Sequence, residues 1–288
     1  MGYNHNYKAG NQGDMVKHPA LIAAVDGVLA GWTGETFRYA DTFAGHASNP
    51  LVDGPDYEWP NGVGRLADRA ALAGGKDAVA TWVRRYLGGP QISGLIYPGS
   101  AAIAAGICAE RGRQHRLALW DISPDALASL RRAFGGGDHA IHDVPATTSD
   151  ADVGEADFLL IDPPGIGRDK GFPSWAELVA FLDAGRDREQ AVLMWLPVNA
   201  NTTVKPPAED GQSRRSRQDA LARGYDVSKV RWYRGGRTIG CQLLYRLPAT
   251  VAEAVRKTVD RTAAVAGWQN DLSEFGIEAV VHYLADNP

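Results

Sequence analysis

An Asp-Pro-Pro motif ends one strongly apolar run of the chain and carries the clearest chemical signal. The run Asp157-Phe-Leu-Leu-Ile-Asp162 is typical of a strand buried on both faces, and Pro163 and Pro164 follow it. Two prolines cannot continue a central strand, so the chain must turn sharply after Asp162. That turn would direct the carboxylate into a crevice, where it could hold an amine with its lone pair facing a methyl donor. Taken alone, the motif favours a simpler interpretation, a proline-terminated strand with a capping Asp.

Three other segments place acidic residues after apolar runs. Asp41-Thr-Phe-Ala-Gly45 is a small-residue turn whose backbone could approach a ligand closely, although a plain strand-exit turn fits equally well. Asp121 closes a second run, where an acidic residue typically binds the ribose hydroxyls of a nucleoside. It could instead cap the following helix, but Ser123 suits that role better, so we favour ribose binding. Asp143 follows a third run and would lie beside an adenine ring, or be an ordinary turn residue.

These residues need a scaffold that brings strand ends together, and the hydrophobic pattern predicts one. Strand-like runs alternate with helical patterns, which indicates a mostly parallel sheet covered by helices on both faces. Ligands bind such sheets at the carboxyl ends of the strands. The expected helices are residues 16–29, 101–109, 124–134, 175–184 and 250–265, and the expected strands are residues 36–41, 116–121, 140–142, 157–162, 191–196, 227–233 and 242–247.

Residues 47–90 interrupt this alternation. A run rich in Pro, Gly and Asp leads into an amphipathic pattern, which we interpret as a helical insertion after the first strand. The predicted domains are a Rossmann-like domain of residues 1–46 and 91–288 and an insertion subdomain of residues 47–90. The apolar positions of the expected insertion helix are Leu66, Ala70, Val79, Trp82, Val83 and Tyr86.

Composition narrows the class of protein. The sequence has no run of 18 apolar residues, so we expect no membrane span. Its first residues have no apolar segment of the kind found in a signal peptide. Cys108 and Cys241 lack metal-like spacing, so we expect buried thiols, no metal site and a cytoplasmic location. The net charge of −4 argues against a protein that grips nucleic acid with its whole surface. A basic strip from Lys205 to Arg237 could bind nucleic acid locally or be a solvated face.

The order of the motifs resembles that of the RlmJ family, bacterial large-subunit ribosomal RNA adenine-N6 methyltransferases. The segment from Tyr3 to His18 is similar to the family's unusual N-terminal signature, and Tyr97-Pro-Gly-Ser100 is similar to its next motif. Asp162-Pro163-Pro164 resembles the catalytic motif, and Met194-Trp195-Leu-Pro197 resembles a Trp-Tyr-Pro block. The resemblance covers nearly the whole chain. It implies a Rossmann-like class I methyltransferase fold, the cofactor S-adenosyl-L-methionine and an adenine of 23S ribosomal RNA as methyl acceptor.

The resemblance also implies roles for single residues. Asp162 would hold the target amine or accept its proton, with Pro163 and Pro164 completing the catalytic motif. Tyr3 would contact the RNA, and Gly165 and Trp195 occupy further substrate positions. The implied cofactor-binding residues are Lys17, His18, Asp41, Phe43, Ser100, Asp121, Asp143 and Val144.

The sequence departs from the family mostly on the substrate side. Gly165 replaces a Tyr that stacks on the flipped target base, an interaction worth about 1–3 kcal/mol. Phe172 or Trp175 could supply a ring in its place, and Leu196 replaces a second aromatic residue. On the cofactor side, Phe43 replaces a His and Val144 replaces a Gly. Cofactor binding is therefore the firmer of the two implied properties.

Three hypotheses follow from these patterns. The first is transfer of a methyl group to an adenine amine of RNA, with the basic strip guiding the phosphate backbone. The second keeps the methyl donor but changes the acceptor to a small-molecule amine or nucleoside, which Gly165, Leu196 and the acidic net charge favour. The third is a module that binds cofactor or RNA without methyl transfer. The sequence lacks the glycine motifs that are typical of a serine hydrolase, a P-loop ATPase and a nicotinamide dehydrogenase, which argues against these three classes.

Overall fold

A computed structural model gives the structure of the chain. It describes residues 7–66, 72–88, 93–167, 172–201, 208–232, 238–266, 268 and 281–282.

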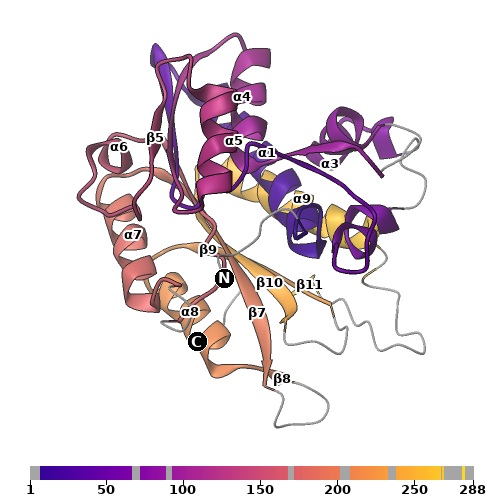
Figure 1. The fold of residues 1–288 in the computed structure, drawn as a ribbon. Helices are drawn as coiled ribbons and strands as arrows, with labels where there is room; N and C mark the ends of the chain where they lie inside the picture. Colours follow the sequence, from indigo (N-terminus) through magenta and orange to yellow (C-terminus); the bar gives the residue numbers. More distant parts are fainter. Residues whose placement is uncertain are drawn as a thin grey trace.

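One twisted sheet organises the fold (Figure 1). Five neighbouring strands run parallel, in the order β5 (Ala140–His142), β4 (Gln114–Trp120), β1 (Thr36–Asp41), β6 (Phe158–Ile161) and β7 (Ala191–Asn201). The sheet continues through antiparallel pairs to β10 (Thr238–Arg246), β9 (Asp226–Arg231) and β11 (Val281–His282), while β8 (Ala208–Glu209) pairs with the end of β7. The expected Rossmann-like sheet is thus confirmed.

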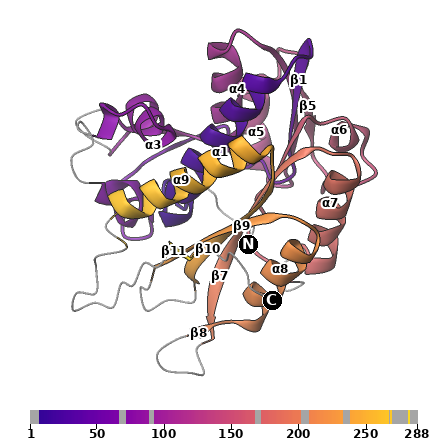
Figure 2. The same cartoon turned by 180° about the vertical axis from the view of Figure 1, so that it is seen from behind.

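Burial on both faces explains why the central strands are apolar. On β6, Leu160 belongs to one hydrophobic core, whereas Leu159 and Ile161 belong to the other, as the two-residue period of a strand requires. Figure 2 shows the two layers of helices that cover these faces. The first core lies under α1 (Gln12–Gly31), α4 (Ser100–Glu110) and α9 (Ala249–Val265), and the second lies under α7 (Trp175–Asp187) and α8 (Gly211–Ala222).

Most expected elements are present, and local signals account for their ends. Strand β5 and helix α5 (Pro124–Phe134) have the expected bounds, and α5 begins with a proline at its first position. Helix α1 begins four residues earlier than expected, because the Asn11 side chain caps it by accepting a hydrogen bond from the Asp14 N–H. We did not predict α8, which Asp210 caps in the same way, or the short α6 (Ala151–Gly154).

The insertion is divided into shorter elements than the sequence predicted. A single amphipathic helix through Leu66 to Tyr86 is wrong for the part of that segment that the structure describes. Leu72 and Gly75 close a turn, and Asp77 then caps a new helix. The elements of the insertion are β2 (Ser48–Pro50), η1 (Trp59–Asn61), η2 (Val63–Arg65), α3 (Ala78–Trp82) and η3 (Val83–Leu87). Strand β2 pairs with β3 (Ile96–Pro98), just after the insertion, in a two-stranded sheet that the sequence did not predict. The division into two domains stays a prediction.

Candidate functional site

The acidic residues that the sequence predicted lie along one edge of the sheet. Asp41 ends β1, while Asp121, Asp143 and Asp162 come just after β4, β5 and β6. Because these strands are parallel neighbours, their carboxyl ends meet at the same edge. This edge is the candidate site.

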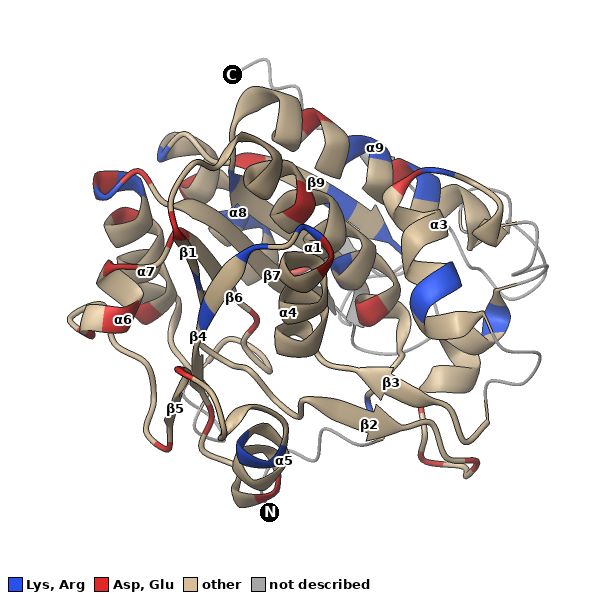
Figure 3. Cartoon of the chain, turned by 90° about the horizontal axis from the view of Figure 1, so that it is seen from above, with Lys and Arg blue, Asp and Glu red and all other residues tan. Residues whose placement is uncertain are grey.

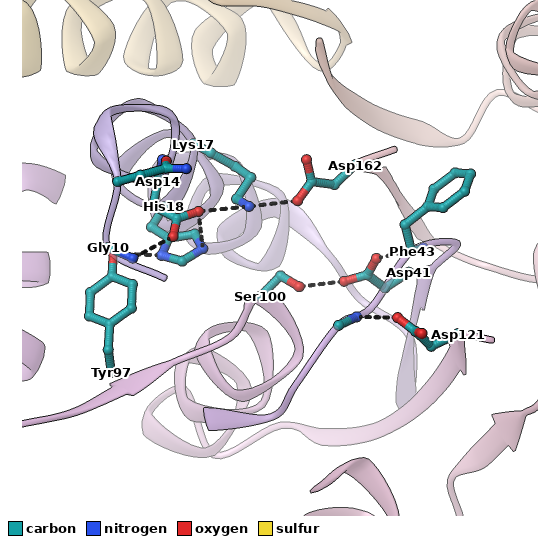
Figure 4. Close-up of polar contacts among 12 residues, drawn as sticks. Gly10, Asp14, Lys17, His18, Asp41, Phe43, Tyr97, Ser100, Asp121 and Asp162 are labelled. Carbon is teal, nitrogen blue, oxygen red and sulfur yellow. Dashed lines mark hydrogen bonds and ion pairs between the residues drawn. The ribbon is translucent and has the colours of Figure 1, made fainter. Parts of the chain in front are cut away.

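Helix α1 contributes a charged face to the site (Figure 4). Asp14, Lys17 and His18 are spaced by three and four residues, so they project from the same side of the helix. The Lys17 Nζ lies 2.6 Å from the Asp162 Oδ2 and 2.9 Å from the Asp14 Oδ1. The three side chains are only 12–17% exposed, which makes this a largely buried arrangement of one cation between two carboxylates.

Burial and charge act in opposite directions on these groups. Burial raises the pKa of Asp162 above its ordinary value, although the Lys17 ammonium opposes the shift. Burial disfavours the charge of Lys17, but the attraction of Asp14 and Asp162 outweighs it and raises the pKa of Lys17. Burial also works against the charge of Asp14, yet its pKa is lowered because Lys17, His18 and the Gly10 N–H stabilise the carboxylate. Lys17 is therefore a permanent cation beside Asp162.

His18 is enclosed by protein groups. Its Nδ1 lies 2.8 Å from the Tyr97 hydroxyl, its Nε2 lies 3.6 Å from the Asp14 Oδ1, and its ring is 3% exposed. Burial lowers the pKa of His18 to about 3, so the ring is neutral at physiological pH. Both ring nitrogens of this predicted cofactor residue thus already face side chains of the protein.

Asp41 and Ser100 form a second buried pair. The Ser100 hydroxyl donates to the Asp41 Oδ2 over 2.5 Å, and the Phe43 N–H donates to the Oδ1 over 3.2 Å. Burial raises the pKa of Asp41 to about 7, with these hydrogen bonds opposing it. Ser100 follows Gly99, where a Cβ would come within 2.0 Å of the His46 carbonyl oxygen, so only glycine lets α4 begin this close to β1.

Asp121 ties two loops of the edge together. Its Oδ2 accepts the Gly45 N–H over 2.9 Å, and its Oδ1 accepts the Ser123 N–H over 2.7 Å. Gly45 has a φ of 62°, a left-handed conformation that glycine adopts without strain. The Asp121 carboxylate thus fixes the turn after β1.

The outer part of the edge is open. Val144 is 53% exposed, and Ile122, next to Asp121, is 65% exposed. Asp143 pairs with Arg131 at 3.3 Å in an exposed ion pair. We had not predicted Ile122; its apolar side chain directly after the acidic end of a strand was the available signal.

The turn after Asp162 is packed by apolar residues, unlike the rest of the edge, where carboxylates dominate. Pro163 and Gly165 are buried, Pro164 is half-buried, and the Gly167 N–H donates to the Pro173 carbonyl. A Cβ at Gly165 would lie 2.9 Å from the Phe172 Cδ2, so the Phe172 ring rests directly on the glycine. Trp175 instead donates its indole N–H to Asp219. Of the two rings considered as substitutes, Phe172 is the one placed at the motif.

Trp195 joins β7 to the start of α1. A Cβ at Gly13 would lie 2.7 Å from the Trp195 Cζ2, so the indole packs where Gly13 leaves room. Asp14, one residue later, was missed by the sequence analysis, although its spacing from Lys17 and His18 could have revealed it. Tyr3 lies outside the described residues.

The basic strip is not one continuous surface. Arg217 and Lys229 are 7% and 6% exposed, and Arg223 pairs with Asp183 at 3.0 Å. Figure 3 shows Lys and Arg interspersed with Asp and Glu over the described chain. Arg217 and Lys229 are therefore too buried to line a surface along which RNA could run, and they do not form a solvated face either. Arg214 and Arg215 on α8 are exposed, while Lys205, Arg234 and Arg237 lie outside the described residues.

The described residues contain no helix long and apolar enough to cross a membrane. Among the same residues, no group of three or more His, Cys, Asp or Glu side chains could hold a metal ion. Cys108 and Cys241 are buried and unbridged, as expected from their spacing.

Comparison with known proteins supports the same class of fold. A crystal structure of a Legionella pneumophila protein, described by the family model DUF519, superposes with a TM-score of 0.68 at 14% identity, covering 96% of this chain and 98% of that one. With the strand order, this shows a Rossmann-like α/β fold with a mostly parallel sheet. No family model matches the chain.

The resemblance inferred from the motifs is also confirmed by a curated sequence. The chain is 28% identical over 178 residues to the ribosomal RNA large subunit methyltransferase J of Haemophilus influenzae. That match covers 57% of this chain and 59% of the curated protein.

Proposed function

We propose that this protein transfers a methyl group from S-adenosyl-L-methionine to an adenine N6 amine of ribosomal RNA. The observation that carries the proposal is the Asp162 carboxylate, held by Lys17 at the sheet edge directly after β6. The named activity of the Haemophilus influenzae relative supports it. An acceptor of this kind places the protein in the cytoplasm.

The residues at the outer edge fit the proposed cofactor. Asp121 lies directly after β4, the position at which an acidic residue of such a fold binds ribose hydroxyls, and Ile122 and Val144 expose apolar side chains suited to the faces of an adenine ring. Asp41 and Ser100 lie between this edge and Asp162. When bound, the cofactor supplies an electrophilic methyl group. The direct cofactor contacts of Lys17, His18, Phe43 and Asp143 stay predictions.

Asp162 would orient the acceptor. Its carboxylate can accept an N–H bond of the amine and leave the nitrogen lone pair free to attack, so positioning supplies much of the rate. As the new N–C bond forms, the amine becomes cationic and loses a proton. The raised pKa makes Asp162 a better acceptor of that proton than an exposed Asp would be. Lys17 keeps the carboxylate ionised until then.

The turn after Asp162 also holds an aromatic ring. The Phe172 ring lies on Gly165, three residues after Asp162, and a nucleobase can stack on such a ring. This supports a planar acceptor. The buried positions of Arg217 and Lys229 favour a second candidate, a free nucleoside or other small planar amine, because such a substrate needs no long basic surface. A module that binds cofactor or RNA without transfer is the third candidate.

The test uses purified protein, labelled S-adenosyl-L-methionine and three acceptors: unmethylated 23S ribosomal RNA, its fragments, and free nucleosides. Asp162→Asn should lower methyl transfer by on the order of a hundredfold or more, with little change in cofactor affinity. Asp157→Asn is the matched control, because Asp157 precedes the same strand and its carboxylate accepts the Arg38 N–H at the opposite end of β6 from Asp162.

The outcomes separate the candidates. RNA-dependent incorporation that Asp162→Asn removes and Asp157→Asn keeps supports the proposal. Incorporation into free nucleosides alone selects the small-molecule acceptor. Cofactor binding without transfer to any acceptor selects the binding module. Unchanged turnover in Asp162→Asn contradicts the role assigned to this carboxylate.

A further inference from the structure

A line of polar contacts runs from the insertion to the Asp162 carboxylate. It begins at Trp82 on α3 and Tyr97 on β3. From Tyr97 it passes along α1 and ends at Asp162, after β6 (Figure 4). The side chains in order are Trp82, Tyr97, His18, Asp14, Lys17 and Asp162. Tyr97 and Trp82 are fully buried, so their polar atoms must form hydrogen bonds with protein groups instead of bulk water.

The numbers of donors and acceptors on Trp82, Tyr97 and His18 fix the direction of these hydrogen bonds. The Trp82 indole N–H can only donate, and it lies 3.3 Å from the Tyr97 oxygen. The Tyr97 hydroxyl then has one hydrogen to give, and His18 Nδ1 lies 2.8 Å away. An Nδ1 that accepts this bond carries no proton, so the neutral ring carries its hydrogen on Nε2.

The opposite arrangement is costly. A proton on Nδ1 would leave the Tyr97 hydroxyl hydrogen without its nearby acceptor. It would also turn the bare Nε2 lone pair towards the Asp14 Oδ1 at 3.6 Å, where a carboxylate repels it. With the hydrogen on Nε2, the ring instead presents a positive edge to the carboxylate.

Asp14 converts this orientation into a fixed position for Lys17. Its Oδ2 accepts the Gly10 N–H over 2.8 Å, and its Oδ1 faces both His18 Nε2 and Lys17 Nζ. The carboxylate is therefore held from three sides, and the ammonium that it holds is the partner of Asp162.

We propose that Tyr97 is a positioning residue that sets the Nε2–H tautomer of His18 and, through Asp14, holds Lys17 on Asp162. Tyr97 on β3 and its partner Trp82, which belongs to the insertion, thus help to orient the group that receives the acceptor. The kinetic part of this proposal rests on the proposed methyl transfer, whereas its tautomer part stands without it.

The first experiment measures the tautomer in the unaltered protein. Imidazole nitrogens of ¹⁵N-histidine-labelled protein are observed by NMR at neutral pH, and His18 is assigned by its absence from the spectrum of His18→Gln. We expect a protonated Nε2 and an unprotonated Nδ1. A protonated Nδ1, either as the other tautomer or as the imidazolium, overturns the proposal.

The second experiment separates positioning from packing. Tyr97→Phe keeps the ring and removes the hydroxyl, and we expect kcat for methyl transfer to fall about tenfold, the scale of one lost buried hydrogen bond. The KM for S-adenosyl-L-methionine should stay within about twofold, because Tyr97 acts on the acceptor side. The matched control is Tyr245→Phe, which removes an equally buried hydroxyl that bonds Ser228 at 2.9 Å, outside this line of contacts.

The result that supports the proposal is a kcat loss in Tyr97→Phe at a temperature where both variants are folded, with Tyr245→Phe near the unaltered protein. Equal kcat in Tyr97→Phe and the unaltered protein, or an equal loss in both variants, overturns it. If the unaltered protein methylates no acceptor, the proposed function fails instead, and the tautomer of His18 still decides whether Tyr97 has the assigned role.

Discussion

The two halves of the candidate site are built on different principles. Around α1 and the end of β6, charges are buried and paired side chain to side chain, as Lys17 is with Asp14 and Asp162. At the ends of β4 and β5, the carboxylate of Asp121 is tied to backbone N–H groups, and Ile122 and Val144 point into solvent.

This difference fits two different tasks. A preorganised buried group costs little further reorganisation when a substrate arrives, which suits the half that would position the acceptor. Exposed apolar side chains are stabilised when a ligand covers them, which suits the half that would bind the cofactor. Substitutions in the first half should therefore affect stability strongly, and those in the second half should affect binding.

The largest effect should come from Lys17→Met. It leaves the Asp14 and Asp162 carboxylates buried without their cation, and breaking such a pair costs about 3–5 kcal/mol. Urea unfolding at pH 7 measures the loss, which should shrink in acid as the carboxylates take up protons. The control is Arg111→Met. The side chains of Arg111 and its partner Asp26 are 43–45% exposed, so losing this ion pair should lower the free energy of unfolding by less than about 1 kcal/mol. Similar losses in the two variants would contradict the distinction between the halves.

A second prediction concerns pH and Asp41. The pKa of Asp41 rises from 3.8 to about 7 on folding, so the folded state binds the proton more tightly than the unfolded chain does. This group's contribution to stability is full below pH 3.8 and is lost as pH rises through about 7. Asp41→Asn should therefore gain stability relative to the unaltered protein across this window, by a few kcal/mol, since a tenfold change in an equilibrium constant is about 1.4 kcal/mol. Denaturant unfolding at several pH values tests it, and a difference independent of pH would refute it.

A smaller effect is expected at the open edge. Asp121→Ala should weaken binding of S-adenosyl-L-methionine by about 1–3 kcal/mol, the scale of unmatched ribose hydroxyls. Its effect on the fold should be limited to the loops that Gly45 and Ser123 anchor. Calorimetry gives the affinity and circular dichroism checks the fold. Unchanged affinity in a folded variant would mean that Asp121 only ties the loops together.

Local signals made one part of this molecule predictable from sequence. The strand before Asp162 is apolar throughout because both its faces are covered, and a proline starts α5. Asp14, Lys17 and His18 share a helix face by their spacing alone, so even the missed Asp14 was accessible from the sequence.

Long-range packing made another part unpredictable. Tyr97 lies 79 residues from His18, and only the tertiary fold brings the two side chains together. The burial of Arg217 and Lys229 depends on how α8 and β9 pack, which the basic composition of that segment hides. Phe172 reaches Gly165 through a tertiary contact, beside the hydrogen bond from the Gly167 N–H to the Pro173 carbonyl.

The most direct test of the account is calorimetric titration of the purified protein with S-adenosyl-L-methionine and S-adenosylhomocysteine. The account predicts binding at one site with micromolar affinity for the unaltered protein. Absence of binding by the folded protein would mean that the acidic edge survives only as scaffold, and it would contradict the proposed methyl transfer.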